Sequence, residues 1–133
     1  MSTSTIYTVN STANSVTPTN IIPLGNTVRR FGCNIAQDGN TISLKGRGYY
    51  LINAAITLTP TAIGNVGVTM SKDGAAVTGA SGVGSVSAVG NSVTIPITAV
   101  VRNACDCDSS ILSFVLDTTA ATVVNIAVSV VKL

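Results

Sequence analysis

The 133-residue sequence contains no histidine and no tryptophan, and all five of its acidic residues are aspartates. Histidine is the commonest general base in enzymes and the commonest metal ligand in proteins. Without it, no Ser-His or Cys-His nucleophile can be assembled within one chain. Paired catalytic carboxylates and a phosphate-binding glycine loop are also missing from the pattern. We therefore expect that the protein is not an enzyme.

Charge is scarce as well, because only 9% of the residues are charged and the formal net charge is +2. So low a charge argues against a nucleic-acid partner and against a polybasic membrane patch. The mean hydropathy is nevertheless high, at +0.53. The most apolar segment, residues 122–133, is too short for a membrane-spanning helix, which needs about 20 apolar residues. We expect no membrane association, and we attribute the apolarity to burial in an oligomer.

The N-terminal residues lack the basic start and the apolar run of a secretory signal, so we expect synthesis in a host cytoplasm without export by the general route. Residues 1–20 are rich in Ser, Thr and Asn. They are predicted to form a polar arm, extended or as a weak edge strand, that anchors the protein by adding a strand to a partner sheet. Its expected contact residues are Ile6, Tyr7 and Val9.

Residues 21–133 are predicted to form one all-β domain, because β-branched Val, Ile and Thr dominate the composition and suit a pleated sheet. Strict alternation predicts a strand over residues 49–59 and another over 93–101, where Pro96 suits an edge strand or a bulge. Asp73-Gly74 predicts a hairpin turn. The glycine-rich residues 79–92 are expected to be a long loop or short exposed strands, and residues 122–133 a last strand. Seven or eight such strands indicate a β-sandwich or jelly roll.

Three features of residues 25–133 resemble the C1q/TNF-like jelly-roll family, most closely its bacterial branch typified by the BclA C-terminal domain. They are Gly48-x-Tyr50-x-Ile52, the hairpin at Lys72-Asp73-Gly74 followed by Ala75-Ala76-Val77, and the apolar last strand. Ile22-Pro23-Leu24-Gly25 and Arg29-Arg30-Phe31-Gly32-Cys33 also resemble small virion proteins of Firmicute phages and prophages. The family usually carries Gly-Asp-x-[Val/Ile] where this chain has Cys105-Asp106-Cys107-Asp108, and there is no collagen-like stalk.

The resemblance implies a homotrimer with the strands at 49–59 and 122–133 in the sheet around the three-fold axis. If Tyr50 and its even-numbered neighbours face the core, an uncharged row remains on the other side of that strand. In the last strand, Val124, Ile126, Val128 and Val130 are expected to fill the core. The predicted trimer interface consists of Tyr49, Leu51, Ala55, Asn125, Ala127, Ser129 and Val131.

The three cysteines leave two interpretations open. An odd number without an export signal argues against a disulfide framework. They are either small buried or turn thiols, or ligands of a structural metal ion at the 105–108 turn. No other cofactor is expected. The candidate metal ligands are Cys33, Cys105, Cys107, Asp106 and Asp108.

From these features, with the resemblance, we expect a structural or binding protein on a phage particle: a capsid decoration, a head fibre or a tail-associated trimer. Its partner would be the major capsid protein or another virion protein. Arg29 and Arg30 could contact an acidic lattice or a phosphate, or could be ordinary surface residues. One alternative is a receptor domain that binds host glycans through Tyr49 or the 79–92 segment. Another is a structural protein of the spore surface.

Overall fold

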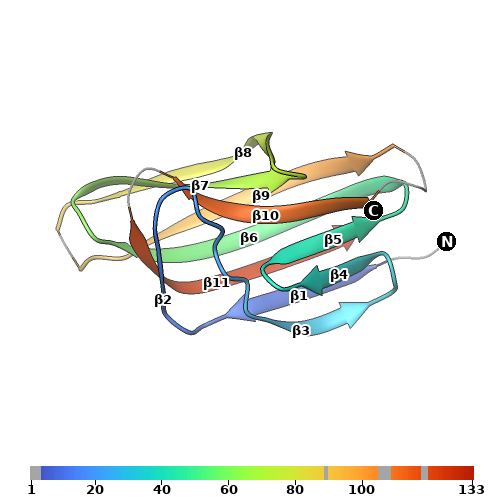
Figure 1. Cartoon of the computed structure of the whole chain (residues 1–133), viewed down its shortest axis with the longest axis horizontal. Helices are drawn as coiled ribbons and strands as arrows, with labels where there is room; N and C mark the ends of the chain where they lie inside the picture. Colours follow the sequence, from blue (N-terminus) through green and yellow to red (C-terminus); the bar gives the residue numbers. More distant parts are fainter. Residues whose placement is uncertain (1–3, 89, 105–108, 118–119) are drawn as a thin grey trace.

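The computed structural model of the chain describes residues 4–88, 90–104, 109–117 and 120–133. The described residues form two antiparallel sheets that face each other in a flattened sandwich (Figure 1). Eleven strands lie in these ranges, more than the seven or eight that the turns suggested. In the described part of the chain, no helix has the length and apolarity that crossing a membrane requires.

The first sheet has the strand order β3-β1-β11-β6-β9, and the short β2 pairs with the start of β11. Every pairing in this sheet is antiparallel. Its strands are β1 (Thr5–Asn10), β2 (Asn14–Val16), β3 (Asn26–Phe31), β6 (Gly48–Pro60), β9 (Val93–Asn103) and β11 (Ala121–Lys132).

The second sheet has the order β4-β5-β10-β7-β8. The segment between β2 and β3 runs beside the end of β10, where Ile22 N–H donates to the Phe114 carbonyl at 2.7 Å. The side chains of Ile22 and Leu24 in this segment are buried in the core. The strands of this sheet are β4 (Ile35–Asp38), β5 (Thr41–Lys45), β7 (Gly64–Lys72), β8 (Ala75–Val86) and β10 (Ser109–Asp117).

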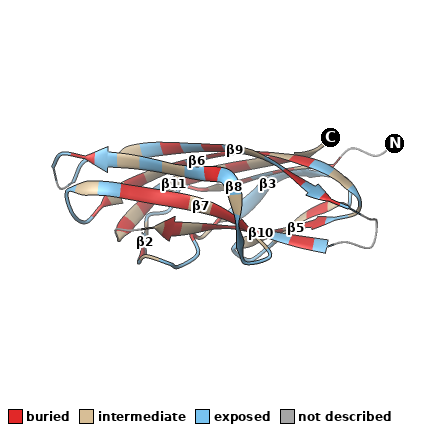
Figure 2. Cartoon of the chain, turned by 90° about the horizontal axis from the view of Figure 1, so that it is seen from above, coloured by how far each residue is buried: buried red, intermediate tan, exposed pale blue. Residues whose placement is uncertain are grey.

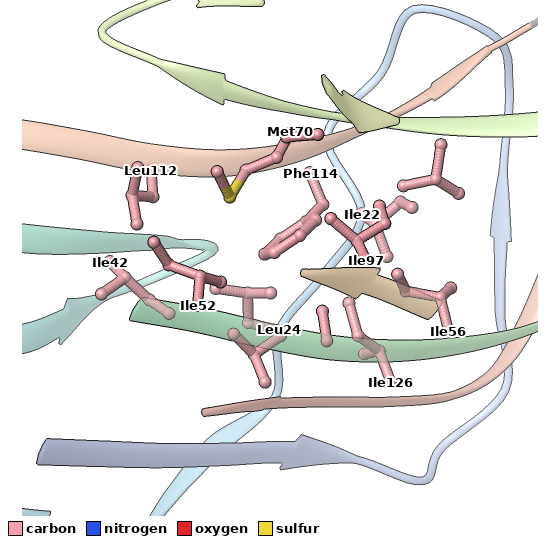
Figure 3. Close-up of a cluster of buried hydrophobic side chains, with 14 of the residues drawn as sticks. Ile22, Leu24, Ile42, Ile52, Ile56, Met70, Ile97, Leu112, Phe114 and Ile126 are labelled. Carbon is pink, nitrogen blue, oxygen red and sulfur yellow. The ribbon is translucent and has the colours of Figure 1, made fainter. Parts of the chain in front are cut away.

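The core lies between the sheets and is built from branched aliphatic side chains around Phe114 and Met70 (Figure 3). The expected period of two holds along β6, and Figure 2 shows the resulting alternation of buried and exposed residues. The buried row of this strand is Tyr50, Ile52, Ala54, Ile56 and Leu58, as predicted from the sequence.

The last strand differs from its predicted pattern at one place. The register between β11 and β6 shifts between Val123 and Asn125, which marks a β-bulge. A bulge adds one residue to one strand and so reverses which side chains face the core. Val123 is therefore buried, whereas Val124, predicted to be in the core, is 39% exposed. The predicted core positions Ile126, Val128 and Val130 are correct.

The N-terminal segment is not a separate arm over residues 5–16, which corrects the sequence interpretation. β1 lies between β11 and β3 and pairs with both. Its inward side chains Ile6 and Thr8 are buried in the sandwich. The pattern hid this strand, because two of its three inward residues, Thr8 and Asn10, are polar.

The glycine-rich segment also forms more strand than expected, because β8 extends to Val86, although its pairing with β7 shifts register between Ala76 and Ser81. β8 and β9 belong to different sheets and come together at one side of the sandwich, with Gly82 and Gly84 against β9. A Cβ on Gly82 would lie 2.4 Å from Ile95 Cγ2, so only glycine permits this approach. Pro96 lies in an edge strand, as predicted.

Candidate functional site

The candidate site is the outer face of the first sheet, meaning the side that points away from the core. Strand register places residues of β1, β11, β6 and β9 in rows across it. One row joins Val131, Leu51 and Val100, and another joins Ala127, Ala55 and Pro96. The rows consist of Thr5, Tyr7, Val9, Asn125, Ala127, Ser129, Val131, Leu51, Asn53, Ala55, Thr57, Thr94, Pro96, Thr98 and Val100.

None of the residues in these rows carries a charge. A sheet face that meets water in a soluble antiparallel sandwich normally alternates to polar and charged residues. The face instead leaves large apolar groups in water: Val100 is 54% exposed and Tyr7 is 40% exposed. An uncharged face with exposed apolar groups favours an interaction site.

A ladder of short polar side chains crosses the outer face between β6 and β9. Thr98 Oγ1 donates to Asn53 Oδ1 at 2.9 Å. The hydroxyl oxygens of Thr57 and Thr94 lie 3.1 Å apart, and one of them donates to the other. These pairs satisfy part of their hydrogen-bonding capacity within the chain, which lowers the cost of covering the face with a partner.

Positive charge begins at the margin of the face. The Arg102 guanidinium lies 5.9 Å from the centroid of the Tyr49 ring, a cation–π geometry. Lys72 Nζ donates to the Arg102 carbonyl at 2.8 Å and holds the end of β9 against the second sheet. Tyr49 is 53% exposed beside this pair. The face is thus uncharged at its centre and charged at its rim, and a rim of polar and charged residues is common at interaction surfaces.

The seven residues predicted for a trimer interface all lie on this one face. The structure adds residues that the sequence reasoning placed elsewhere. Tyr7 and Val9, assigned to the arm, lie on the outer face, whereas Ile6 is buried in the core. The contribution of β9 was missed, although the alternation over 93–101 carried the signal, because only its inward half was interpreted.

The candidate metal site is not assembled in the described part of the chain, where no group of three or more Cys, Asp, Glu or His side chains comes together. Cys33 is an exposed free thiol. Cys105, Asp106, Cys107 and Asp108 lie outside the described residues. No pocket is found in the described structure.

No protein-family model and no curated protein matches this chain. Solved structures do match along nearly the whole length. Murine APRIL at pH 5.0 gives a TM-score of 0.76 at 14% identity, covering 99% of this chain and 100% of that chain. Eiger TNF from S. frugiperda gives 0.72 at 9% identity, covering 98% of this chain and 91% of that chain.

Two further matches are a complement protein domain and a vertex protein. The globular domain of zebrafish complement 1qA protein gives a TM-score of 0.70 at 8% identity, covering 97% of this chain and 95% of that chain. The PRD1 vertex protein P5 gives 0.61 at 16% identity, with the same coverage of 97% and 95%. The BclA branch is not among these matches and stays a prediction. Two antiparallel sheets in the observed order, with these likenesses, show that the chain has the C1q/TNF-like jelly-roll fold.

Proposed function

We propose that the protein is a non-enzymatic structural or binding component of a phage particle and that it forms a homotrimer through the outer face. The single observation that carries the proposal is the uncharged, partly apolar outer face of β1, β11, β6 and β9. Leaving such a face in water is unfavourable, and a stable oligomer that covers it would bury roughly 2,000 Å² or more. The resemblance of the sequence to trimeric C1q/TNF-like proteins supports three as the number of copies.

The particle assignment rests on two further points. The sequence resembles small virion proteins of phages, and its fold is similar to that of a phage vertex protein, PRD1 P5. The major capsid protein or another virion protein would then be the lattice on which the trimer sits. The alternatives are a glycan receptor domain and a spore-surface protein. The measurements on purified particles described below separate them from the virion role.

Light scattering after size exclusion tests the trimer. We expect a trimeric wild type, and we expect Ala127→Arg to dissociate it, because three buried arginines without partners would cost several kcal/mol. Ala76→Arg is the matched control, since Ala76 is exposed on β8, away from the outer face. A monomeric wild type, or a trimeric Ala127→Arg variant with an unchanged melting temperature, would contradict the proposal.

Mass spectrometry of purified particles tests the location. Phage particles induced from the source strain and spores of the same strain are purified separately, and the chain is quantified in each. Enrichment in the phage particles supports the virion role, whereas enrichment in spores favours the spore-surface alternative. Absence from both, together with hits on a glycan array, favours the receptor domain.

A further inference from the structure

β3 is the open edge of the sandwich. All six of its residues, Asn26–Phe31, are exposed, and among the described residues its backbone pairs only with β1. Figure 1 shows β3 along the lower margin of the molecule, with no strand beyond it. A strand in this position presents a row of unpaired N–H and C=O groups that can pair with another chain.

The other edges are protected. β9 carries Pro96, which has no N–H to donate, and β8 lies against β9 through its glycines. β4 is tied to β3 from the second sheet, since Arg30 Nε donates to the Ile35 carbonyl at 2.8 Å and Thr27 Oγ1 donates to Gln37 Oε1 at 2.7 Å. These bonds fix β3 in place while its outward edge stays exposed. β3 contains no proline. Its protection consists of Arg29, Arg30 and a bulge at Val28, and the two positive charges disfavour a partner strand that is not acidic.

The side chains of β3 indicate what kind of strand would pair with it. Val28 is 55% exposed and Phe31 is 67% exposed, so a partner would gain apolar contacts. Arg29 and Arg30 are exposed beside them. A second copy of β3 would bring its own two arginines against these two, and like charges on neighbouring strands are destabilising. Charge complementarity therefore favours a partner strand with acidic residues.

We propose that the β3 edge binds an extended segment of a partner protein, in which apolar and acidic residues alternate, by adding that segment as a further strand. This inference rests on the proposed function in one respect, because it identifies the surface that a particle protein would contact. It also reverses the expected direction of strand addition, in which residues 1–20 of this chain would add a strand to a partner sheet. The N-terminal segment of this chain is already committed to its own sheet, so the extended segment comes from the partner.

Fluorescence anisotropy with two labelled synthetic peptides tests the inference on the full-length protein. One peptide alternates Val and Glu, the other alternates Val and Lys, and both have capped ends. We expect the Val/Glu peptide to bind and the Val/Lys peptide to bind at least about tenfold more weakly. Added salt should weaken the Val/Glu complex, because the charges are exposed. Equal affinity for the two peptides would overturn the proposal.

Two variants locate the site. Arg29→Glu should weaken Val/Glu peptide binding about tenfold, whereas Lys45→Glu, with the same change in net charge on the second sheet, should not. Amide hydrogen exchange with the Val/Glu peptide should protect residues 26–31. Protection confined to β6 and β11 would assign the peptide to the outer face and overturn the proposal. Light scattering on the same samples reports the trimer separately.

Discussion

At the scale of single residues, one buried side chain links the start of β6 to the preceding turn. Tyr50 is fully buried, and its hydroxyl lies 2.8 Å from the Lys45 carbonyl oxygen and 2.9 Å from that of Gly46. Burial raises the pKa of Tyr50 above its ordinary value of 10.0, because a phenolate loses hydration in the core. The hydrogen bonds that hold the turn at Gly46, whose φ is +95°, thus depend on a neutral tyrosine.

This pKa shift predicts how stability depends on pH. Below the ordinary pKa both the folded and the unfolded chain keep the proton, and the stability is fully present. As pH rises above 10.0, the unfolded chain loses its proton first. The free energy of unfolding therefore decreases over the pH range between the ordinary pKa and the raised pKa of the folded state. Urea titrations at about pH 9 and about pH 11 should show this loss in the wild type and a smaller loss in Tyr50→Phe. Equal losses in both proteins would contradict the assignment to Tyr50.

Residue patterns also set the limit of what the sequence can predict. The period of two predicted the buried row of β6 and most of β11, because each inward position there is apolar. It failed at Val124, since Val123 and Val124 are chemically identical and only strand pairing decides which one enters the core. A bulge changes the pairing without changing the composition. The interface residues predicted on β11 lie on the expected face, because Asn125 and the residues after it follow the bulge.

At the scale of elements, β1 and β8 show two different reasons why a strand differs from its sequence interpretation. β1 has polar residues at two of its three inward positions, and its place is fixed by pairing with β11, about as far along the sequence as the chain allows. β8 is rich in glycine, which is usually depleted in strands. Its glycines serve the approach to β9, a contact between sheets that local propensity does not encode.

The contact between β8 and β9 predicts a specific steric penalty. A Cβ on Gly84 would lie 2.5 Å from Val93 Cγ2, so Gly84→Ala should destabilise the fold by about 1–3 kcal/mol through overpacking. Val93→Ala removes the clashing methyl groups. In a double-mutant cycle measured by urea unfolding, Gly84→Ala should therefore cost less in the Val93→Ala background. Additive costs would show that the strands do not meet at these residues.

At the scale of the whole molecule, the sandwich has two surfaces of different character on the same sheet. The outer face is uncharged and suits copies of the same chain, while the β3 edge beside it carries Arg29 and Arg30. Tyr7 pairs with Arg29 and joins the two surfaces. A trimer that covers the outer face would leave the charged edge to meet a different partner, which separates self-assembly from attachment.

Self-assembly through the outer face predicts that stability depends on protein concentration. A trimer that unfolds to separate chains gains stability by mass action, so its melting temperature rises with the concentration of the chain. Calorimetry over a hundredfold concentration range (on the order of micromolar to a tenth of millimolar) should show this rise in the wild type and in Ala76→Arg. Ala127→Arg should melt at a lower temperature that no longer depends on concentration, because its outer face cannot be covered by a second copy. A wild-type melting temperature that is constant across the range would mean that Leu51, Ala55 and their neighbours stay in water, and the outer face would then need another partner.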